Sequence, residues 1–228
     1  MTELAKVLSL LTPSAPRFRT LQVTGREWRN NARLVAAFLR WTPLEAGTAS
    51  FVSVSQEDQP NETEDVWRMW VEVPDCMKVD FAVGRETVTA VFRGNSWWSW
   101  AQSQGVHTND GLENLHHGKG PGEILLHPAA LTPCLKFELR GSITQLGRLA
   151  YKVRGTPIIG EDDCSLNDLG LGADEYELLV DAELGFLLGA EARLDDLPFR
   201  ILEITSLDVD LPLPASTFRL QVPGGRQF

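Results

Sequence analysis

The chain has 228 residues, of which 43% are hydrophobic, enough for a substantial core. Its net charge is −10, and the excess is concentrated in residues 160–228, which hold 4 basic and 15 acidic residues. Nucleic-acid binding requires clustered positive charge, so this distribution argues against a nucleic-acid partner.

The cysteines and the start of the chain bear on its compartment. Cys76, Cys134 and Cys164 are odd in number and widely spaced, so we expect reduced thiols. The first apolar run, from Val7 to Leu11, is too short for a secretory signal. No stretch reaches the roughly 20 apolar residues of a spanning helix. We therefore predict a cytoplasmic protein that does not span a membrane.

Two amphipathic helices are predicted near the start of the chain. The first is capped by Thr2 and stopped by Pro13. Its apolar face consists of Leu4, Val7, Leu8 and Leu11. The second helix has Asn30 as its cap and ends before Pro43. Its apolar stripe consists of Leu34, Val35, Phe38, Leu39 and Trp41.

After residue 65 the apolar period changes to two, which is typical of strands. Residues 18–28, between the two helices, also read as extended. Later strands are predicted at residues 66–73, 77–83, 87–93, 96–101, 135–143, 149–154, 176–181, 186–194 and 199–209. Residues 55–65 and 158–172 are predicted loops. Many short strands with helices at one end of the sequence indicate an antiparallel sheet packed on helices.

Three of the seven tryptophans lie within four positions, at residues 97–100. Strand alternation places Trp98 and Trp100 on one face, and Trp97 with Ser99 on the other. The indoles either fill the core under the helices or line a ligand cavity. The sequence leaves both interpretations open.

The sequence contains no convincing catalytic constellation. All four histidines fall between His107 and His127, with Cys134 close behind, but two are adjacent and the spacing does not suit one ion. In the glycine-rich segment Gly118–Gly122, Pro121 removes a backbone donor that a phosphate loop would use. No Ser, His and acid are placed as a triad. We therefore predict no catalytic residues, no metal site and no cofactor.

Glu203 breaks the apolar pattern of the last predicted strand, because it shares a face with Ile201 and Leu207. A carboxylate on a buried face must be paired or neutralised. We expect Glu203 to face the interior and to pair with Arg26 or Arg33. The alternative is a β-bulge that turns Glu203 outward.

Turn and packing signals recur in several stretches of the chain. They lie at residues 66–74, 88–100, 147–157, 176–199 and 218–223. In these stretches the chain resembles the LolA-type superfamily, which comprises bacterial lipoprotein-localisation factors and related anti-sigma-factor regulators. The element Arg26–Trp28 is also similar to one in uncharacterised actinobacterial proteins. The resemblance implies an α+β, mainly β fold, with an antiparallel sheet curled into an open half-barrel around short N-terminal helices.

We expect one domain over residues 1–228, with a helix-rich part at 1–45 and an antiparallel meander at 66–223. The predicted function is non-enzymatic binding of a lipid-like or other apolar molecule between sheet and helices. The predicted cavity residues are Leu34, Phe38, Trp67, Met69, Val71, Phe81, Phe92, Trp98, Trp100, Phe186 and Glu203. The alternative is a regulatory or interaction module that binds an apolar peptide segment of a partner protein. An enzyme of unknown type comes third.

Overall fold

The computed structural model describes residues 2–13, 15–41, 60–83, 86–108, 120, 122–158 and 165–219. They form an antiparallel sheet of 11 strands in the order β6-β5-β4-β3-β2-β1-β11-β10-β9-β8-β7. The strands are β1 (Thr20–Asn30), β2 (Glu62–Glu72), β3 (Cys76–Val83), β4 (Glu86–Arg93), β5 (Ser96–Ala101), β6 (Gly105–Thr108), β7 (Leu135–Gln145), β8 (Arg148–Pro157), β9 (Glu175–Asp181), β10 (Leu187–Leu194) and β11 (Leu197–Val209). The helices are α1 (Glu3–Leu11), α2 (Asn31–Trp41) and α3 (Glu123–Leu126), with the short 3₁₀ helices η2 (Pro128–Leu131) and η3 (Ser165–Asp168).

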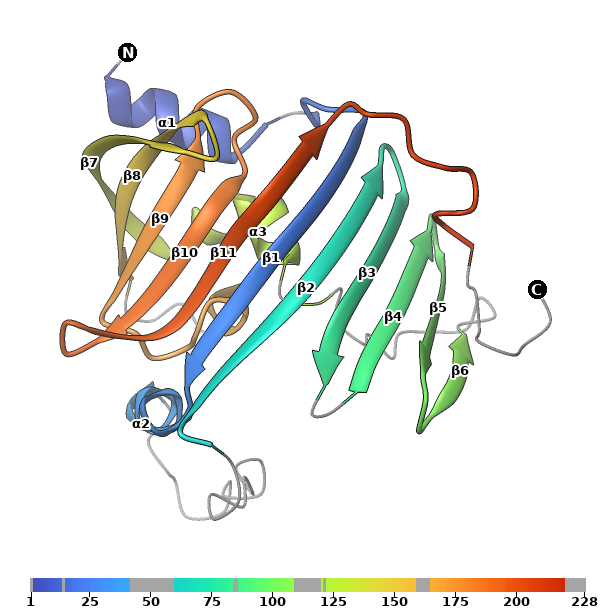
Figure 1. The fold of residues 1–228 in the computed structure, drawn as a ribbon. Coiled ribbons are helices and arrows are strands. Elements are labelled where there is room, and N and C mark those ends of the chain that lie inside the picture. The colour runs from blue at the N-terminus through green and yellow to red at the C-terminus, as the bar shows by residue number, and fades with distance from the viewer. Residues whose placement is uncertain are drawn as a thin grey trace.

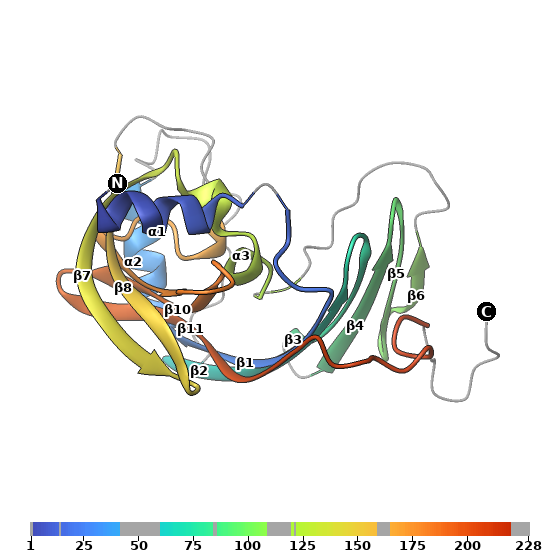
Figure 2. The same ribbon diagram turned by 90° about the horizontal axis from the view of Figure 1, so that it is seen from above.

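The sheet is strongly curved and does not close into a barrel (Figure 1). Seen from above, β7–β11 curl around the helices, whereas β3–β6 continue as a second wall (Figure 2). We call α1, α2, α3, η2 and η3 the helical plug. Seen from above, α1–α3 lie inside the outline of the curved sheet (Figure 2), and in Figure 1 α1 lies at its upper end, α2 at its lower end and α3 between them. The α+β, mainly β fold with an open half-barrel is therefore confirmed. The plug contains α3 from the middle of the chain as well as the two N-terminal helices.

The predicted caps of the two N-terminal helices are confirmed. Thr2 accepts a hydrogen bond from the backbone N–H of Ala5 at 3.3 Å. Asn30 Oδ1 accepts from the backbone N–H of Arg33 at 3.1 Å. In α2 the fully buried residue is Ala37, so the buried stripe of this helix is narrower than predicted.

The sequence missed the start of β2, the edge strand β6 and the helix α3. The first four residues of β2 lie inside a predicted loop, because the inward positions there are the polar Thr63 and Asp65. Without inward apolar residues, a strand gives no hydrophobic alternation. β6 and α3 have only four residues each, too few for a period to be recognised.

Trp67 joins the centre of the sheet to the plug. Its side chain is in the core and its ring lies between Gly25 of β1 and Gly122, which precedes α3. A Cβ at Gly25 would lie 2.1 Å from Trp67 Cζ2, and one at Gly122 would lie 2.6 Å from Trp67 Cζ3. Only residues without a side chain leave room for this indole, so β1, β2 and α3 meet around it.

The two N-terminal helices pack closely against two glycines in turns of the C-terminal half. A Cβ at Gly172 would lie 1.9 Å from the carbonyl oxygen of Ala37 in α2, and one at Gly185 would lie 2.2 Å from that of Leu10 in α1. Both glycines have positive φ, 84° and 81°, which favours glycine independently of space. These close contacts pack α1 and α2 against the C-terminal half of the chain.

Asp181 anchors the turn between β9 and β10. It is fully buried and accepts hydrogen bonds from Arg148 Nε at 2.5 Å and from the backbone N–H groups of Glu183 and Leu184 at 2.9 and 2.7 Å. The Asp181 carboxylate raises the pKa of Arg148 above its usual value, mainly through this hydrogen bond. The buried charge is thus paired and hydrogen-bonded.

A β-bulge in β11 decides which residues of that strand face the plug. Thr24 pairs with Ser206, but Gly25 pairs with Ile204, so Thr205 is the extra residue. Because of this extra residue, the positions that face inward are even-numbered just before the bulge (Leu202, Ile204) and odd-numbered after it (Leu207, Val209). An alternation assumed to run unbroken through the whole strand therefore assigns one of the two parts to the wrong face.

Because of the bulge, Glu203 lies on the convex face, and the expectation that it faces the interior is wrong. Its neighbours Leu202 and Ile204 are buried instead. Glu203 Oε2 accepts from Arg26 Nε at 2.7 Å, and its Oε1 accepts from Gln145 Nε2 at 3.0 Å. The bulge alternative is correct, and the partner is one of the two arginines that we expected.

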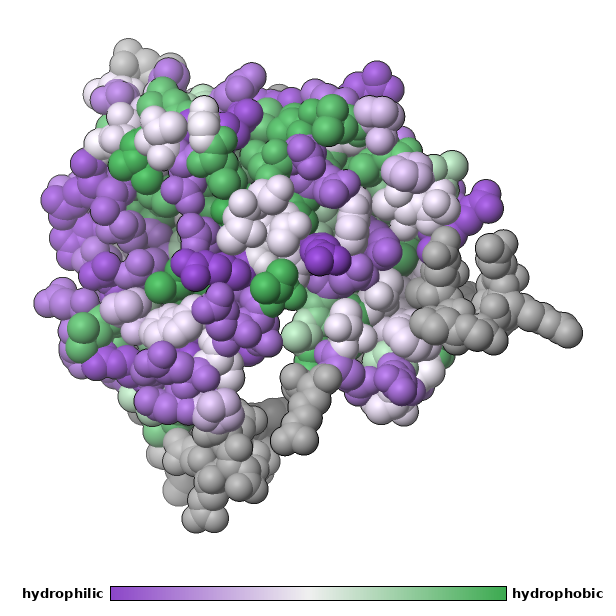
Figure 3. All heavy atoms as spheres, viewed as in Figure 1, coloured by the Kyte–Doolittle hydropathy of each residue, from purple (hydrophilic) through white to green (hydrophobic). Residues whose placement is uncertain are grey.

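The convex face over β8–β10 is largely hydrophilic (Figure 3). Ion pairs follow these strands, with Lys152 Nζ 2.8 Å from Glu177 Oε1 and Arg193 Nη2 2.6 Å from Glu191 Oε1. Polar residues on the convex face and apolar residues under the plug are typical of an antiparallel sheet covered on one side.

The expectation of reduced thiols is wrong for Cys134. Cys76 is a free thiol, whereas Cys134 is disulfide-bonded. Disulfides persist mainly in oxidising compartments.

We predict that Gly122→Ala lowers the free energy of unfolding by about 1–3 kcal/mol, because the new methyl group would overlap the Trp67 ring. Gly122 has φ −80° and ψ −13°, which alanine adopts readily, so the cost would be steric. Urea denaturation measures the change. Gly189→Ala is the control, since its Cβ would meet Leu179 at an ordinary 3.5 Å. The cost should fall clearly in a Trp67→Phe background, and equal costs in both backgrounds would contradict the packing described.

We predict that Asp181→Asn lowers the free energy of unfolding by about 3 kcal/mol, because it leaves the Arg148 guanidinium without its buried partner. Glu183→Gln is the control. Glu183 contacts the same guanidinium at 2.9 Å, but its side chain is 79% exposed, so its loss should cost less than about 0.5 kcal/mol. Equal midpoints for the two variants in urea would show that Asp181 does not anchor the turn.

Candidate functional site

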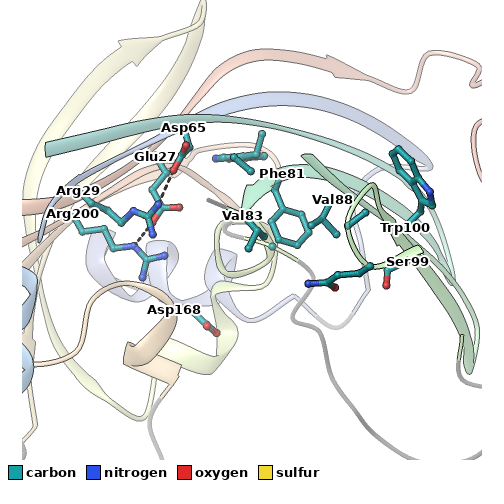
Figure 4. Close-up of a pocket in the computed structure, with 15 residues that line it drawn as sticks. Glu27, Arg29, Asp65, Phe81, Val83, Val88, Ser99, Trp100, Asp168 and Arg200 are labelled. Atoms are coloured by element: carbon teal, nitrogen blue, oxygen red, sulfur yellow. Dashed lines mark hydrogen bonds and ion pairs between the residues drawn. The ribbon is translucent and has the colours of Figure 1, made fainter. Parts of the chain in front are cut away.

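A cavity of about 400 Å³ lies on the concave side of the sheet and is partly open to solvent. It is lined from β1–β5 and β11, with Asp168 of η3 on the plug side (Figure 4). The lining residues are Glu27, Arg29, Asp65, Trp67, Phe81, Ala82, Val83, Val88, Ser99, Trp100, Ala101, Gln104, Gly120, Asp168 and Arg200. The volume is within the range of small-molecule sites.

One end of the cavity carries a charged network (Figure 4). The strand register places like charges opposite each other, Arg29 beside Arg200 and Glu27 beside Asp65. Such pairs repel, and the side chains resolve the repulsion by pairing diagonally. Arg200 Nε donates to Glu27 Oε1 at 2.8 Å, and Arg29 Nη2 donates to Asp65 Oδ2 at 2.6 Å. Arg29 Nε also lies 3.6 Å from Glu27 Oε1, so three ion pairs link the four charges.

Asp168 adds a fifth charged group from the plug. Burial of its carboxyl raises the pKa of Asp168 above its usual value, Arg200 lowers it, and Glu123 raises it further. Its carboxyl therefore takes up a proton at a higher pH than an ordinary aspartate does. This end of the cavity therefore becomes less negative as the pH falls.

The other end of the cavity has an apolar wall formed by Phe81, Val83 and Val88 (Figure 4). Phe81 and Val88 are paired across β3 and β4, so they lie side by side on the concave face. Val83 follows on the same face and is 50% exposed. Apolar side chains that remain accessible on a concave surface are typical of a binding site.

The predicted cavity residues divide between this cavity and the core. Trp67 and Phe81 line the cavity from the concave face, and Trp100 also borders it, although its side chain points to the convex face. Met69 is fully buried in the core. Leu34, Val71 and Phe92 are partly buried and pack against that core. Phe186 is buried and lines a second, apolar cavity of about 210 Å³ beside the end of α1. Phe38 of α2 is partly buried and is not among the lining residues of either cavity.

The aromatic stretch of β5 is divided between the two faces, as alternation predicted. Ser99 pairs with the buried Ala90 and lies on the concave face. Trp98 and Trp100 therefore point to the convex face, and Figure 4 shows Trp100 and Ser99 on opposite sides of β5. The expectation that these two indoles share a face with Trp67 is wrong. Alternation groups residues within a strand, but the pairing with β4 decides which group is concave.

Sequence reasoning missed the charged network. Glu27, Arg29, Asp65 and Arg200 come from three strands, and Arg200 is 171 positions after Arg29. Their one local signal was that each occupies an inward position in a strand, which could be recognised only once the register was known. Polar residues at inward positions are the expected exception at functional sites.

Within the described ranges no group of three His, Cys, Asp or Glu side chains could hold a metal ion. The adjacent histidines at residues 116 and 117 and most of the glycine-rich segment lie outside those ranges. No helix in the described part of the chain is long and apolar enough to cross a bilayer.

No protein-family model matches the chain, and no curated protein matches its sequence. The fold is similar to that of MucB, with a TM-score of 0.58 and 12% identity over 95% of this chain and 62% of that one. The complex of MucA and MucB from Pseudomonas aeruginosa matches with a TM-score of 0.53 and 13% identity over 96% of this chain and 59% of that one. This chain thus spans less than two thirds of the length of MucB.

An uncharacterised conserved protein from Thermus thermophilus matches with a TM-score of 0.52 and 12% identity, over 96% of this chain and 95% of that one. At such identities the similarity concerns the fold alone. The fold of this chain is therefore similar to that of MucB and of the Thermus thermophilus protein.

Proposed function

We propose that this protein is a non-enzymatic binding protein that holds a lipid-like or other apolar molecule in the cavity between the curved sheet and the plug. The observation that carries the proposal is the accessible apolar wall of Phe81, Val83 and Val88 on the concave face. Burial of such a surface by a ligand is favourable by about 25 cal/mol per Å². The LolA-like fold supports a binding role over catalysis.

The alternative occupant is an apolar peptide segment of a partner protein. The cavity is partly open, which an extended segment would need, and MucB is found in a complex with MucA. Native mass spectrometry of protein purified without detergent distinguishes the two. A retained small mass supports the small ligand, whereas an empty cavity that takes up apolar peptides but no dye supports the peptide.

The disulfide at Cys134 bears on the location of this function. A cytoplasmic location was the expectation from sequence, but disulfides are more common in oxidising compartments. We therefore infer an oxidising compartment. Reaction of the denatured, unreduced chain with a thiol reagent tests this inference, since three reactive thiols would contradict it.

We predict that Val83→Asp weakens the binding of a hydrophobic naphthylamine dye by at least about fivefold, because it places a charge on the apolar wall. Val66→Asp is the matched control. Val66 is 58% exposed and pairs with Arg26 on the convex face, so the same substitution there should leave dye binding unchanged. Fluorescence titration measures both variants. Similar losses in both, or none in either, would place the dye elsewhere and contradict the proposed site.

A further inference from the structure

Two donors at the cavity have no hydrogen-bond partner. Trp67 Nε1 and Arg29 Nε are both buried atoms without a hydrogen bond, and both residues line the cavity. The Trp67 side chain is itself almost completely buried, since the residue is 1% exposed. Buried polar atoms are rarely left unpaired, and such an atom at a cavity often marks the place of a missing ligand or water.

The two donors belong to inward-facing residues of the neighbouring strands β1 and β2. The Trp67 ring atoms that a Cβ at Gly25 would meet include Cε2, to which Nε1 is bonded. Gly25 and Arg29 are on one face of β1, since both pair with inward residues of β2. The part of the ring next to Nε1 therefore lies against β1, the strand that carries Arg29.

The chemistry of the two donors limits which groups can accept a hydrogen bond from them. An indole N–H and a guanidinium N–H donate hydrogen bonds and accept none. Glu27 and Asp65 are already engaged with the two arginines, and Arg29 Nε is 3.6 Å from Glu27 Oε1, too far for a good hydrogen bond. The partner must therefore supply acceptor oxygens from outside this network.

The donors and the apolar wall together define a ligand with two parts. Figure 4 shows Arg29 and Arg200 at one end of the cavity, with Phe81 and Val88 beyond them. A cationic head group would meet the arginines and leave both donors unpaired. An anionic oxygen head group forms charge-assisted hydrogen bonds with such donors, and its aliphatic chain would cover the apolar wall.

Building on the proposed function, we propose that the cavity takes an aliphatic chain with an anionic oxygen head group, whose oxygens accept from Trp67 Nε1 and Arg29 Nε. A carboxylate and a phosphate share this chemistry. Decanoate and decyl phosphate serve as the two anionic probes, and decyltrimethylammonium serves as the cationic probe with the same chain.

Isothermal titration calorimetry of the full chain tests the proposal with Trp67→Phe, which keeps an aromatic ring but removes the N–H. We expect the wild type to bind one anionic probe at least about tenfold more tightly than the cationic one, and Trp67→Phe to lose about tenfold of that affinity. Whichever anion binds more tightly identifies the head group. Trp98→Phe is the matched control, because Trp98 Nε1 is also buried and unpartnered but lies on the convex face.

Arg29→Lys provides a second variant in case Trp67→Phe is too unstable to titrate. It keeps a cation for Asp65 but removes the Nε donor, and it should weaken anion binding by about fivefold without changing the cationic probe. The proposal is overturned if the cationic probe binds as tightly as the anions, or if Trp67→Phe and Trp98→Phe behave alike. If no probe and no dye binds, the proposed function itself fails. Dye binding without head-group preference would leave that function standing and remove only this inference.

Discussion

The packing of Trp67 between two glycines is the constraint on which the rest of the structure depends. A large indole at the middle of an 11-stranded sheet would normally hold a covering layer away from the strands. Here the missing side chains of Gly25 and Gly122 let α3 approach the sheet directly. The helix α3 can then lie in the curve of the sheet beside β10 (Figure 2), and the cavity remains on the side of β2–β5.

At the charged end of the cavity, most of the charged groups are paired, but one donor is left without a hydrogen bond. Three ion pairs link Glu27, Arg29, Asp65 and Arg200, which reduces the cost of placing four charges on an inward face. The network is nevertheless incomplete, since the Nε atom of Arg29 has no acceptor. A purely structural network would be expected to satisfy every buried donor. The asymmetry between a charged and an apolar end distinguishes this cavity from the apolar one beside α1.

Much of the fold could be predicted because the signals were local. The caps Thr2 and Asn30 mark both N-terminal helices, and β5 has the predicted bounds. The site was less predictable. Only part of the predicted lining reaches the cavity, since Met69 and Phe186 are buried in the core. Sequence periodicity identifies residues that avoid water, but it does not separate those that fill a core from those that line an accessible space.

By itself, the sequence determined most of the strands, the ends of the two N-terminal helices and the grouping of residues within strands that have no bulge, because these depend on neighbouring residues and on turn chemistry. Tertiary structure alone decided which group faces inward. The bulge at Thr205 turned Glu203 outward to Arg26, and the β4–β5 register sent Trp98 and Trp100 to the convex face. Register and bulges arise from pairing between distant segments, and a shift of one residue exchanges the two faces of a strand.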